Sequence, residues 1–299
     1  MPYDHRNPVT RSLPAALAAL VCSAALAGCG AASEAAEGTR GPAAAATTPG
    51  RSRTPDPSRT PSRTPAADAA RPLAGRTVVV DPGHNPGNFR HPREIDEKVD
   101  IGTARKECDT TGTSTNASGE KAAYTEAAFT LDVSHRLRKA LEARGAEVVL
   151  THDADRPYGP CIDERARIGN AAAADAVVSV HADGSAVGNR GFHVIVPAEV
   201  REGSADTGPI VAPSRTLGEW IAAAFARTTG TSPANYLGDG TGLDVRSDLG
   251  GLNLSTVPKV FVECGNMRDP KDAALLTSGA WRQKAAQGIA DGIVTYLQG

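Results

Sequence analysis

Aromatic side chains and net charge are what this sequence has least of. Phe, Trp and Tyr make up 4% of the 299 residues, and 32 Lys and Arg face 34 Asp and Glu, for a formal net charge of −2. Without a basic excess the chain is not a typical nucleic-acid binder, and we expect no nucleic-acid partner. A hydrophobic fraction of 40% still supports a packed core, which excludes global disorder. The abundance of Ala and the 21 Pro indicate that part of the chain lies outside that core.

A hydrophobic run long enough to span a bilayer is also missing near the N-terminus. The apolar run Leu13–Gly28 has about 16 residues, fewer than the roughly 20 that a span requires. A basic start with Arg6 and Arg11 followed by such a run predicts a signal peptide over residues 1–28. The run ends in the letters LAGC, which resemble the bacterial lipobox, so we expect Cys29 to be acylated after cleavage. The alternative is ordinary cleavage at a small residue, which would leave Cys29 as a plain thiol.

Residues 29–75 have almost no large apolar side chains and contain a loose SRTPDPSRTPSRTP repeat. Such a composition cannot bury enough surface to offset the entropy of ordering, so we expect the lipidated cysteine to be followed by a disordered tether. A coil of this length reaches about 35–40 Å. The alternative is a short extra domain. Residues 76–299 are then expected to form one folded domain.

Strand-type and helix-type segments alternate through residues 76–299. Short apolar, Val-rich runs predict buried strands at Arg76–Asp81, Glu147–Thr151, Asp175–His181, Gly191–Pro197 and Val257–Glu263. Helical spacing of apolar residues predicts helices at Tyr124–Arg144, Asp163–Ala173, Arg215–Thr228, Asp269–Leu276 and Ala280–Leu297. The alternation predicts an α/β fold with a mainly parallel, twisted sheet flanked by helices. A polar segment from His84 to about Lys121 follows the first strand.

Ionisable side chains stand at the ends of three predicted strands. His84 follows the first strand after Asp-Pro-Gly, His181 ends the third, and Glu263 ends the last. Because ligand sites in such sheets lie beyond the carboxyl ends of the strands, we expect these side chains to lie together. Taken singly, each histidine can instead be a capped loop residue, and Glu263 can be a structural salt-bridge partner.

A fourth candidate, Glu126, stands near the start of the predicted helix on the same face as Phe129 and Val133. A carboxylate on a buried face is costly unless it is paired or bound to a cation. Two His and one Glu with an open fourth position form a common catalytic zinc set, and a further carboxylate serves proton transfer in zinc hydrolases. The alternative is a helix N-terminal carboxylate favoured by the helix dipole.

At these positions the sequence resembles the zinc-dependent N-acetylmuramoyl-L-alanine amidases of autolysin type, which hydrolyse peptidoglycan. The matching blocks come in the family's order across residues 76–299: VVDPGH, Glu126 with its helix and EVVLT, RARIGN leading to SVHAD, and GLNL leading to VPKVFVECGNMRDPKDAALL. The resemblance implies that His84, Glu126 and His181 bind one Zn²⁺, with a water as fourth ligand. It also implies that Glu263 is catalytic and that the bond cut joins the muramic acid lactyl group to L-alanine of the stem peptide.

The sequence departs from the family's pattern without losing any of these four residues. Asn85-Pro86 stands where the family commonly has Gly-Gly, His152 where it has Arg, and Gly169 where it has Ala. These departures leave the contacts of the substrate groove open. Arg246 and Asn253, in the polar stretch before the last strand, are candidates for contact with the peptide stem.

The cysteines of the domain are expected to have two roles. Export places the domain in an oxidising compartment, and Cys108 and Cys161 lie in loops whose tips can meet near the site, so we predict a disulfide between them. Cys264 follows Glu263 on a strand and points to the opposite side, which predicts a buried thiol and not a zinc ligand.

The remaining histidines of the domain are expected in loops or at the surface: His91, His135, His152 and His193.

The sequence as a whole favours a lipid-anchored zinc amidase that acts on peptidoglycan as a monomer, on the outer face of the membrane towards the cell wall. One alternative is a peptidoglycan-binding lipoprotein of the same fold without activity, although the intact ligand set and Glu263 speak against it. Another is a zinc peptidase that acts on stem peptides, because the order of the motifs does not decide which amide bond is cut.

Overall fold

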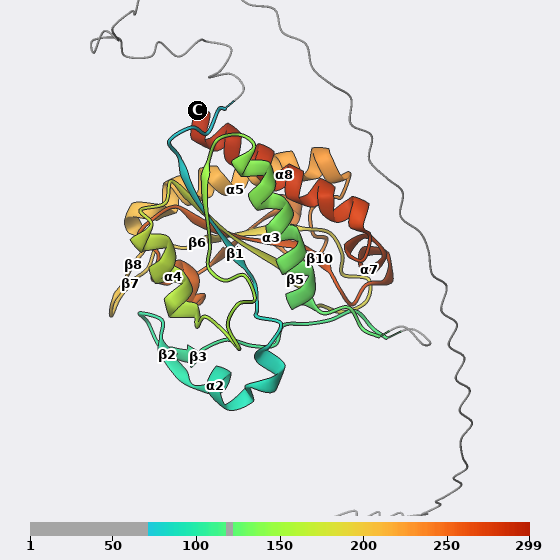
Figure 1. Ribbon diagram of the computed structural model, residues 1–299, viewed down its shortest axis with the longest axis horizontal. Coiled ribbons are helices and arrows are strands. Elements are labelled where there is room, and N and C mark those ends of the chain that lie inside the picture. Colours follow the sequence, from blue (N-terminus) through green and yellow to red (C-terminus); the bar gives the residue numbers. More distant parts are fainter. Residues whose placement is uncertain (1–70, 118–121) are drawn as a thin grey trace, which may run out of the picture. The chain divides into compact units, whose positions relative to one another are not determined.

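The computed structural model describes residues 71–117 and 122–299, which form a helix-covered sheet (Figure 1). The strands of the central sheet are β1 (Thr77–Pro82), β4 (Glu147–Leu150), β5 (Ala176–Asp183), β6 (His193–Pro197), β9 (Leu243–Arg246) and β10 (Lys259–Asn266). Their order across the six-stranded sheet is β4-β1-β5-β10-β6-β9. Strands β4, β1, β5 and β10 run parallel, and β6 and β9 run in the opposite direction. The predicted α/β fold with a mainly parallel sheet is confirmed.

Long helices cover one face of this sheet: α3 (Glu126–Glu142), α5 (Gly208–Thr229) and α8 (Gly279–Gln298) (Figure 1). The other face carries α4 (Ile162–Ala171) and the short α6 (Gly250–Asn253). Helix α7 (Pro270–Leu276) follows β10. Short elements complete the described part: η1 (Asn88–Arg90), α2 (Pro92–Asp96), β2 (Lys98–Asp100), β3 (Arg105–Glu107), β7 (Arg201–Glu202), β8 (Ala205–Asp206) and η2 (Gly238–Gly240).

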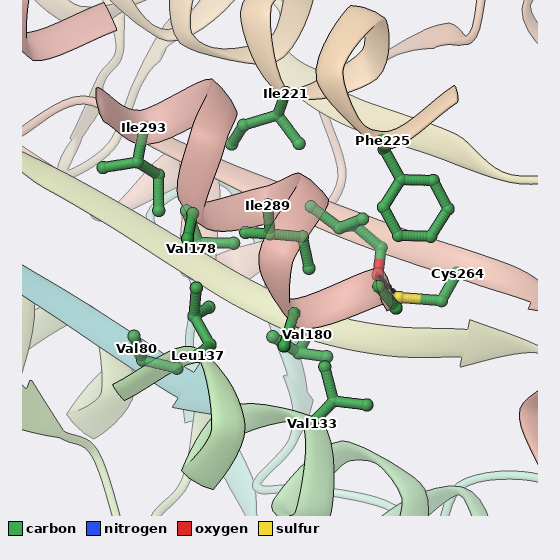
Figure 2. Close-up of a cluster of buried hydrophobic side chains, with 14 of the residues drawn as sticks. Val80, Val133, Leu137, Val178, Val180, Ile221, Phe225, Cys264, Ile289 and Ile293 are labelled. Carbon is green, nitrogen blue, oxygen red and sulfur yellow. Dashed lines mark hydrogen bonds between the residues drawn. The ribbon is translucent and has the colours of Figure 1, made fainter. Parts of the chain in front are cut away.

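The larger hydrophobic core lies between the sheet and the helices α3, α5 and α8 (Figure 2). Helix α3 contributes Val133 and Leu137, which are fully buried because apolar residues recur along one of its faces. Thr125 caps its start by accepting a hydrogen bond from the backbone N–H of Ala128 at 3.3 Å. Burial of each such side chain contributes about 1.5–3 kcal/mol, so this packing fixes where α3 starts relative to the sheet.

The folded part begins earlier than the sequence predicted. Leu73, which we assigned to the tether of residues 29–75, is fully buried in the larger core, and its N–H donates to the carbonyl of Arg144 at 3.0 Å. Residues 71–75 therefore belong to the domain, because their one large apolar side chain has a site in the core. The signal peptide over residues 1–28, Cys29 and the rest of the tether lie outside the described residues.

Several elements of the domain differ from the sequence prediction, among them α5 and β9. Helix α5 begins at Gly208, not Arg215, since Ile210 is buried and Pro213 is accommodated inside the helix. Strand β9 was not predicted, because its short LDVR sequence lacks a run of apolar residues. The polar segment after His84 contains α2 and the β2–β3 hairpin.

Among residues 71–117 and 122–299, no helix combines the length and the apolar character needed to cross a membrane.

Candidate metal centre and active site

The three predicted metal ligands lie together at the carboxyl ends of β1 and β5. His84, Glu126 and His181 each offer one ligand atom, and these atoms lie within 4.8 Å of one another. The parallel pairing of β1 with β5 continues to Pro82 and Val180, so the residues that follow stand side by side. The rings of His84 and His181 have centroids 5.1 Å apart and are perpendicular.

The carboxylate of Glu126 lies between the two imidazoles. Its Oε1 is 3.0 Å from Nδ1 of His181, and its Oε2 is 3.5 Å from Nε2 of His84. Backbone N–H groups fix its orientation: Ala182 donates to Oε1 at 3.2 Å and Thr113 to Oε2 at 2.9 Å. In the metal-free protein burial favours the neutral imidazole of His84, but Glu126 and Asp109 together outweigh it and raise the pKa of His84 to about 10.

Glycines leave the space that these side chains occupy. A Cβ on Gly83 would lie 2.3 Å from the ring of His181. A Cβ on Gly112, where φ is +70°, would lie 2.6 Å from the ring of His84 and 2.7 Å from the carboxylate of Glu126. The absence of a side chain at these two positions therefore leaves room for the three side chains to lie close together.

The donor set fits zinc. Zinc takes His nitrogen and carboxylate oxygen at about 2.0–2.2 Å in a tetrahedron, which separates neighbouring ligand atoms by roughly 3.3–3.5 Å. The pairs around Glu126 already lie at 3.0 Å and 3.5 Å. One ligand atom from each of the three residues lies within 4.8 Å of the other two.

The fourth predicted residue, Glu263, lies next to this cluster. In the register of the sheet it stands opposite His181 of β5 and opposite His193 of β6. Its Oε2 is buried and makes no hydrogen bond with any described residue. Burial, together with the nearby carboxylates of Glu126 and Asp183, raises the pKa of Glu263 well above its usual range.

A groove of about 510 Å³ contains all four predicted residues. Two apolar side chains, Phe261 and Ile195, and two cationic side chains, Arg246 and Arg268, also line it. A smaller cavity of about 70 Å³ is lined by His84 and His181 and by the buried charged residues Asp81, Asp109, Arg165 and Lys259. The larger groove gives a substrate access to both the metal ligands and Glu263.

The profile of the N-acetylmuramoyl-L-alanine amidase family matches residues 78–295. The chain belongs to this family. The amidase Rv3717 of Mycobacterium tuberculosis is 40% identical over 226 residues, which cover 75% of this chain and 88% of the relative. The crystal structure of the amidase Ami1 from Mycobacterium smegmatis has a TM-score of 0.67 at 39% identity and matches 75% of this chain and 98% of that one.

Ami1 from Mycobacterium abscessus, in its apo form, also has a TM-score of 0.67, at 40% identity, with 75% of this chain and 100% of that chain covered. The expectation of an N-acetylmuramoyl-L-alanine amidase, in fold and in activity, is therefore confirmed.

The two predicted substrate contacts of the amidase have different positions. Arg246 lies in β9 and lines the groove, where Asp248 holds its guanidinium through bonds of 2.8 Å and 2.9 Å. Asn253 does not line the groove: it is buried in α6, and its Nδ2 donates to the carbonyl of Ser247 at 2.9 Å. The role of Asn253 as a substrate contact stays a prediction, and the structure directs its side chain towards Ser247.

Two histidines of the amidase that we expected in loops or at the surface are buried. His152 Nε2 lies 3.0 Å from the carbonyl oxygen of Pro82, and burial lowers the pKa of His152 to about 4. His193 is buried beside Glu263, and its Nδ1 has no partner among the described residues. Its place inside a predicted strand was the signal for burial that the sequence contained.

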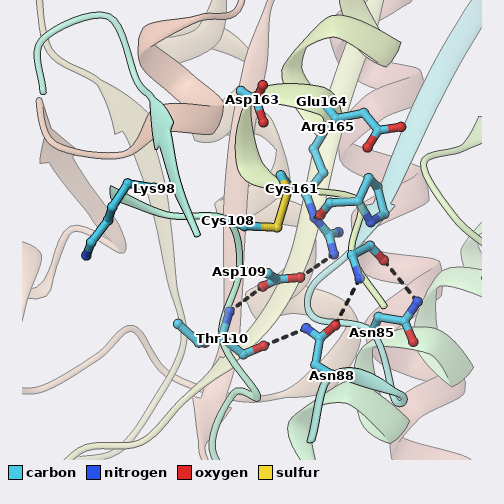
Figure 3. Close-up of a disulfide and its surroundings, with 12 residues drawn as sticks. Asn85, Asn88, Lys98, Cys108, Asp109, Thr110, Cys161, Asp163, Glu164 and Arg165 are labelled. Atoms are coloured by element: carbon cyan, nitrogen blue, oxygen red, sulfur yellow. Dashed lines mark hydrogen bonds and ion pairs between the residues drawn. A yellow bond between two sulfur atoms is a disulfide. The ribbon is translucent and has the colours of Figure 1, made fainter. Parts of the chain in front are cut away.

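The predicted disulfide between Cys108 and Cys161 is present in the amidase (Figure 3). Cys108 follows β3, and Cys161 is the residue before the first turn of α4. Cys264 is a free, buried thiol on the core side of β10, as expected. Two side chains near the metal ligands were missed from the sequence: Asp109 beside Cys108, and Arg165 on α4.

Proposed function

We propose that this amidase uses one zinc ion, held by His84, Glu126 and His181, to hydrolyse the bond between N-acetylmuramic acid and L-alanine of peptidoglycan. The observation that carries the proposal is that these three side chains and Glu263 come from separate elements and meet in one groove. A buried carboxylate is costly unless it is paired or bound to a cation, and Glu126 lies between two imidazoles in a space that glycines leave open.

The metal site and Glu263 have different roles in the hydrolysis. A zinc ion bound here supplies Lewis-acid stabilisation for the carbonyl oxygen of the scissile amide and lowers the pKa of water. Glu263 accepts the proton of the attacking water and passes it to the nitrogen of the leaving L-alanine. Its buried environment raises the pKa of Glu263, which favours transfer of the water's proton to this carboxylate.

The test is the digestion of purified muropeptides by the wild type and by Glu263→Gln, with the zinc content of both measured. We expect Glu263→Gln to keep one zinc per chain and to lose about 10²–10⁴-fold in turnover, the usual contribution of a general acid–base. Glu219→Gln, which changes an exposed carboxylate on α5, is the matched control and should leave both quantities unchanged.

Three outcomes would contradict parts of the proposal. Loss of zinc from Glu263→Gln would make Glu263 a ligand and not the base. Release of free D-amino acids in place of intact stem peptides would identify a peptidase. Retention of muropeptides by the wild type without any product would identify a binding protein of the same fold.

We also propose that the chain is exported as a lipoprotein and acts as a monomer on the outer face of the membrane. The basic start, the short apolar run and the LAGC letters before the tether support this location. Two or more acyl chains on Cys29 would anchor it stably, whereas one chain binds only marginally. Metabolic labelling with a palmitate analogue should mark the wild type and not Cys29→Ala, and equal labelling of both would refute the acylation of Cys29.

A further inference from the structure

Asp109 and Arg165 form a buried ion pair (Figure 3). Asp109 also contacts the imidazole of the proposed metal ligand His84. Asp109 and Arg165 are each 5% exposed. Oδ1 of Asp109 lies 3.0 Å from Nδ1 of His84, and Oδ2 accepts a bond of 2.9 Å from NH2 of Arg165. Oδ1 also accepts from the backbone N–H of Thr110 at 2.7 Å. Both oxygens of this one carboxylate are therefore in use.

The ring of His84 has acceptors at Nδ1 on more than one side. Besides Asp109, the carbonyl oxygen of Thr110 lies 3.2 Å from Nδ1. Two acceptors at Nδ1 keep a proton on that nitrogen when the ring gives up its other proton, as it must to bind a metal. The lone pair is then on Nε2, the nitrogen that faces Glu126 at 3.5 Å.

Arg165 is itself held in place from several directions. Its Nε donates to the carbonyl of Pro160 at 2.9 Å, and its NH1 donates to Oδ1 of Asp81 at 2.7 Å. Asp81 accepts further bonds from Thr151 and Ser179 and lies 3.4 Å from the ammonium of Lys259. The charges of the carboxylates Asp81 and Asp109 are thus matched by those of Arg165 and Lys259. The other bonds of the guanidinium hold it in contact with Asp109.

The disulfide joins the two segments that carry this pair. Cys108 is the neighbour of Asp109, and Cys161 precedes the helix whose first turns carry Arg165. The backbone N–H of Ile162 donates to the carbonyl of Cys108 at 2.8 Å. The covalent link therefore keeps Asp109 and Arg165 in contact (Figure 3).

We propose that Asp109 is a positioning residue for the metal centre: it sets the tautomer and orientation of His84, and Arg165 acts through Asp109 by holding its carboxylate. This inference rests on the proposed zinc site. Asp109 is therefore expected to affect the affinity for zinc and not the proton transfer, which we assign to Glu263. A merely structural salt bridge would instead affect the stability of the fold and leave the zinc affinity of the folded protein unchanged.

The test is zinc binding by the metal-free full-length protein, measured by competition with a chromophoric chelator. We expect Asp109→Asn to bind zinc about 10–100-fold more weakly, the usual effect of removing such a partner of a metal-ligating histidine. An amide can accept from only one side, so it cannot serve both His84 and Arg165. Activity of Asp109→Asn should recover towards that of the wild type when zinc is saturating.

The matched control is Asp175→Asn at the opposite end of β1. Asp175 also accepts from an arginine, Arg76, at 2.7 Å, and from a backbone N–H, that of Thr77, at 2.8 Å. This variant should keep the zinc affinity of the wild type. Arg165→Gln should weaken zinc binding as Asp109→Asn does, and the double variant should be no weaker than Asp109→Asn alone.

The outcomes separate this inference from the proposed function. Zinc affinity of Asp109→Asn equal to that of the wild type would overturn the positioning role and leave the zinc site standing. A wild type that binds no zinc, or whose affinity is unchanged by His84→Ala, would overturn the metal site and this inference with it. If Arg165→Gln does not fold, as circular dichroism would show, Asp109→Asn and Asp175→Asn decide the question by themselves.

Discussion

Removal of the Cys108–Cys161 disulfide should lower the stability of this amidase by about 4 kcal/mol. The cross-linked residues are 53 positions apart. A disulfide that closes a loop of this length lowers the conformational entropy of the unfolded chain and so raises its free energy by about 4 kcal/mol. For a domain of this size, each kcal/mol corresponds to about 2–4 °C in Tm. The double variant Cys108→Ser/Cys161→Ser should therefore unfold about 8–16 °C below the wild type.

The assay is thermal unfolding followed by circular dichroism, with and without a thiol reductant. Reductant should bring the wild type to the Tm of the double variant and should leave the double variant itself unchanged, which makes each protein the control for the other. The zinc affinity of the double variant should also fall, because the link holds Asp109 against Arg165. Equal Tm values for wild type and double variant, both without reductant, would refute the reasoning.

Further predictions concern pH, the space around the metal ligands and the core. In the metal-free protein the pKa of His84 is raised from 6.5 to about 10, so the folded state holds a proton that the unfolded chain loses. The free energy of urea unfolding should fall between pH 6.5 and pH 10, and a flat profile over this range would contradict the reasoning. Calorimetry in different buffers should show proton release on zinc binding. Gly83→Ala places a Cβ 2.3 Å from the ring of His181 and should weaken zinc binding in the chelator assay, whereas Gly279→Ala, with its nearest neighbour at 3.8 Å, should not. Leu137→Ala should cost about 2–5 kcal/mol of unfolding free energy, and unchanged stability in denaturant would argue against its burial in the core.

Much of this fold is encoded locally. The Val-rich runs that became β1, β5 and β10 are buried on both faces, and such strands are visible as continuous apolar stretches. The helix α3 is visible through its apolar spacing. Because parallel strands end at one edge, the positions of His84, His181 and Glu263 in the sequence were enough to predict that they meet.

Other features depend on partners that are distant in the sequence. The reversal of β6 against β10 is a matter of pairing between strands, and no local pattern distinguishes it. The burial of Leu73 depends on a site in the core that α3 and β4 create. The burial of Asn253 depends on how α6 turns its side chain towards Ser247.

By itself, then, the sequence determined the alternation of strands and helices, the edge of the sheet where the chemistry lies, and the ligands and base proposed there, because apolar periodicity and strand ends are properties of neighbouring residues. Only the tertiary structure decided which side chains contact the proposed ligands from inside the protein. Asp109 meets His84 from 25 positions away and Arg165 from 56, and a buried carboxylate shared by an imidazole and a guanidinium exists only once the sheet, α4 and the disulfide have brought these segments together.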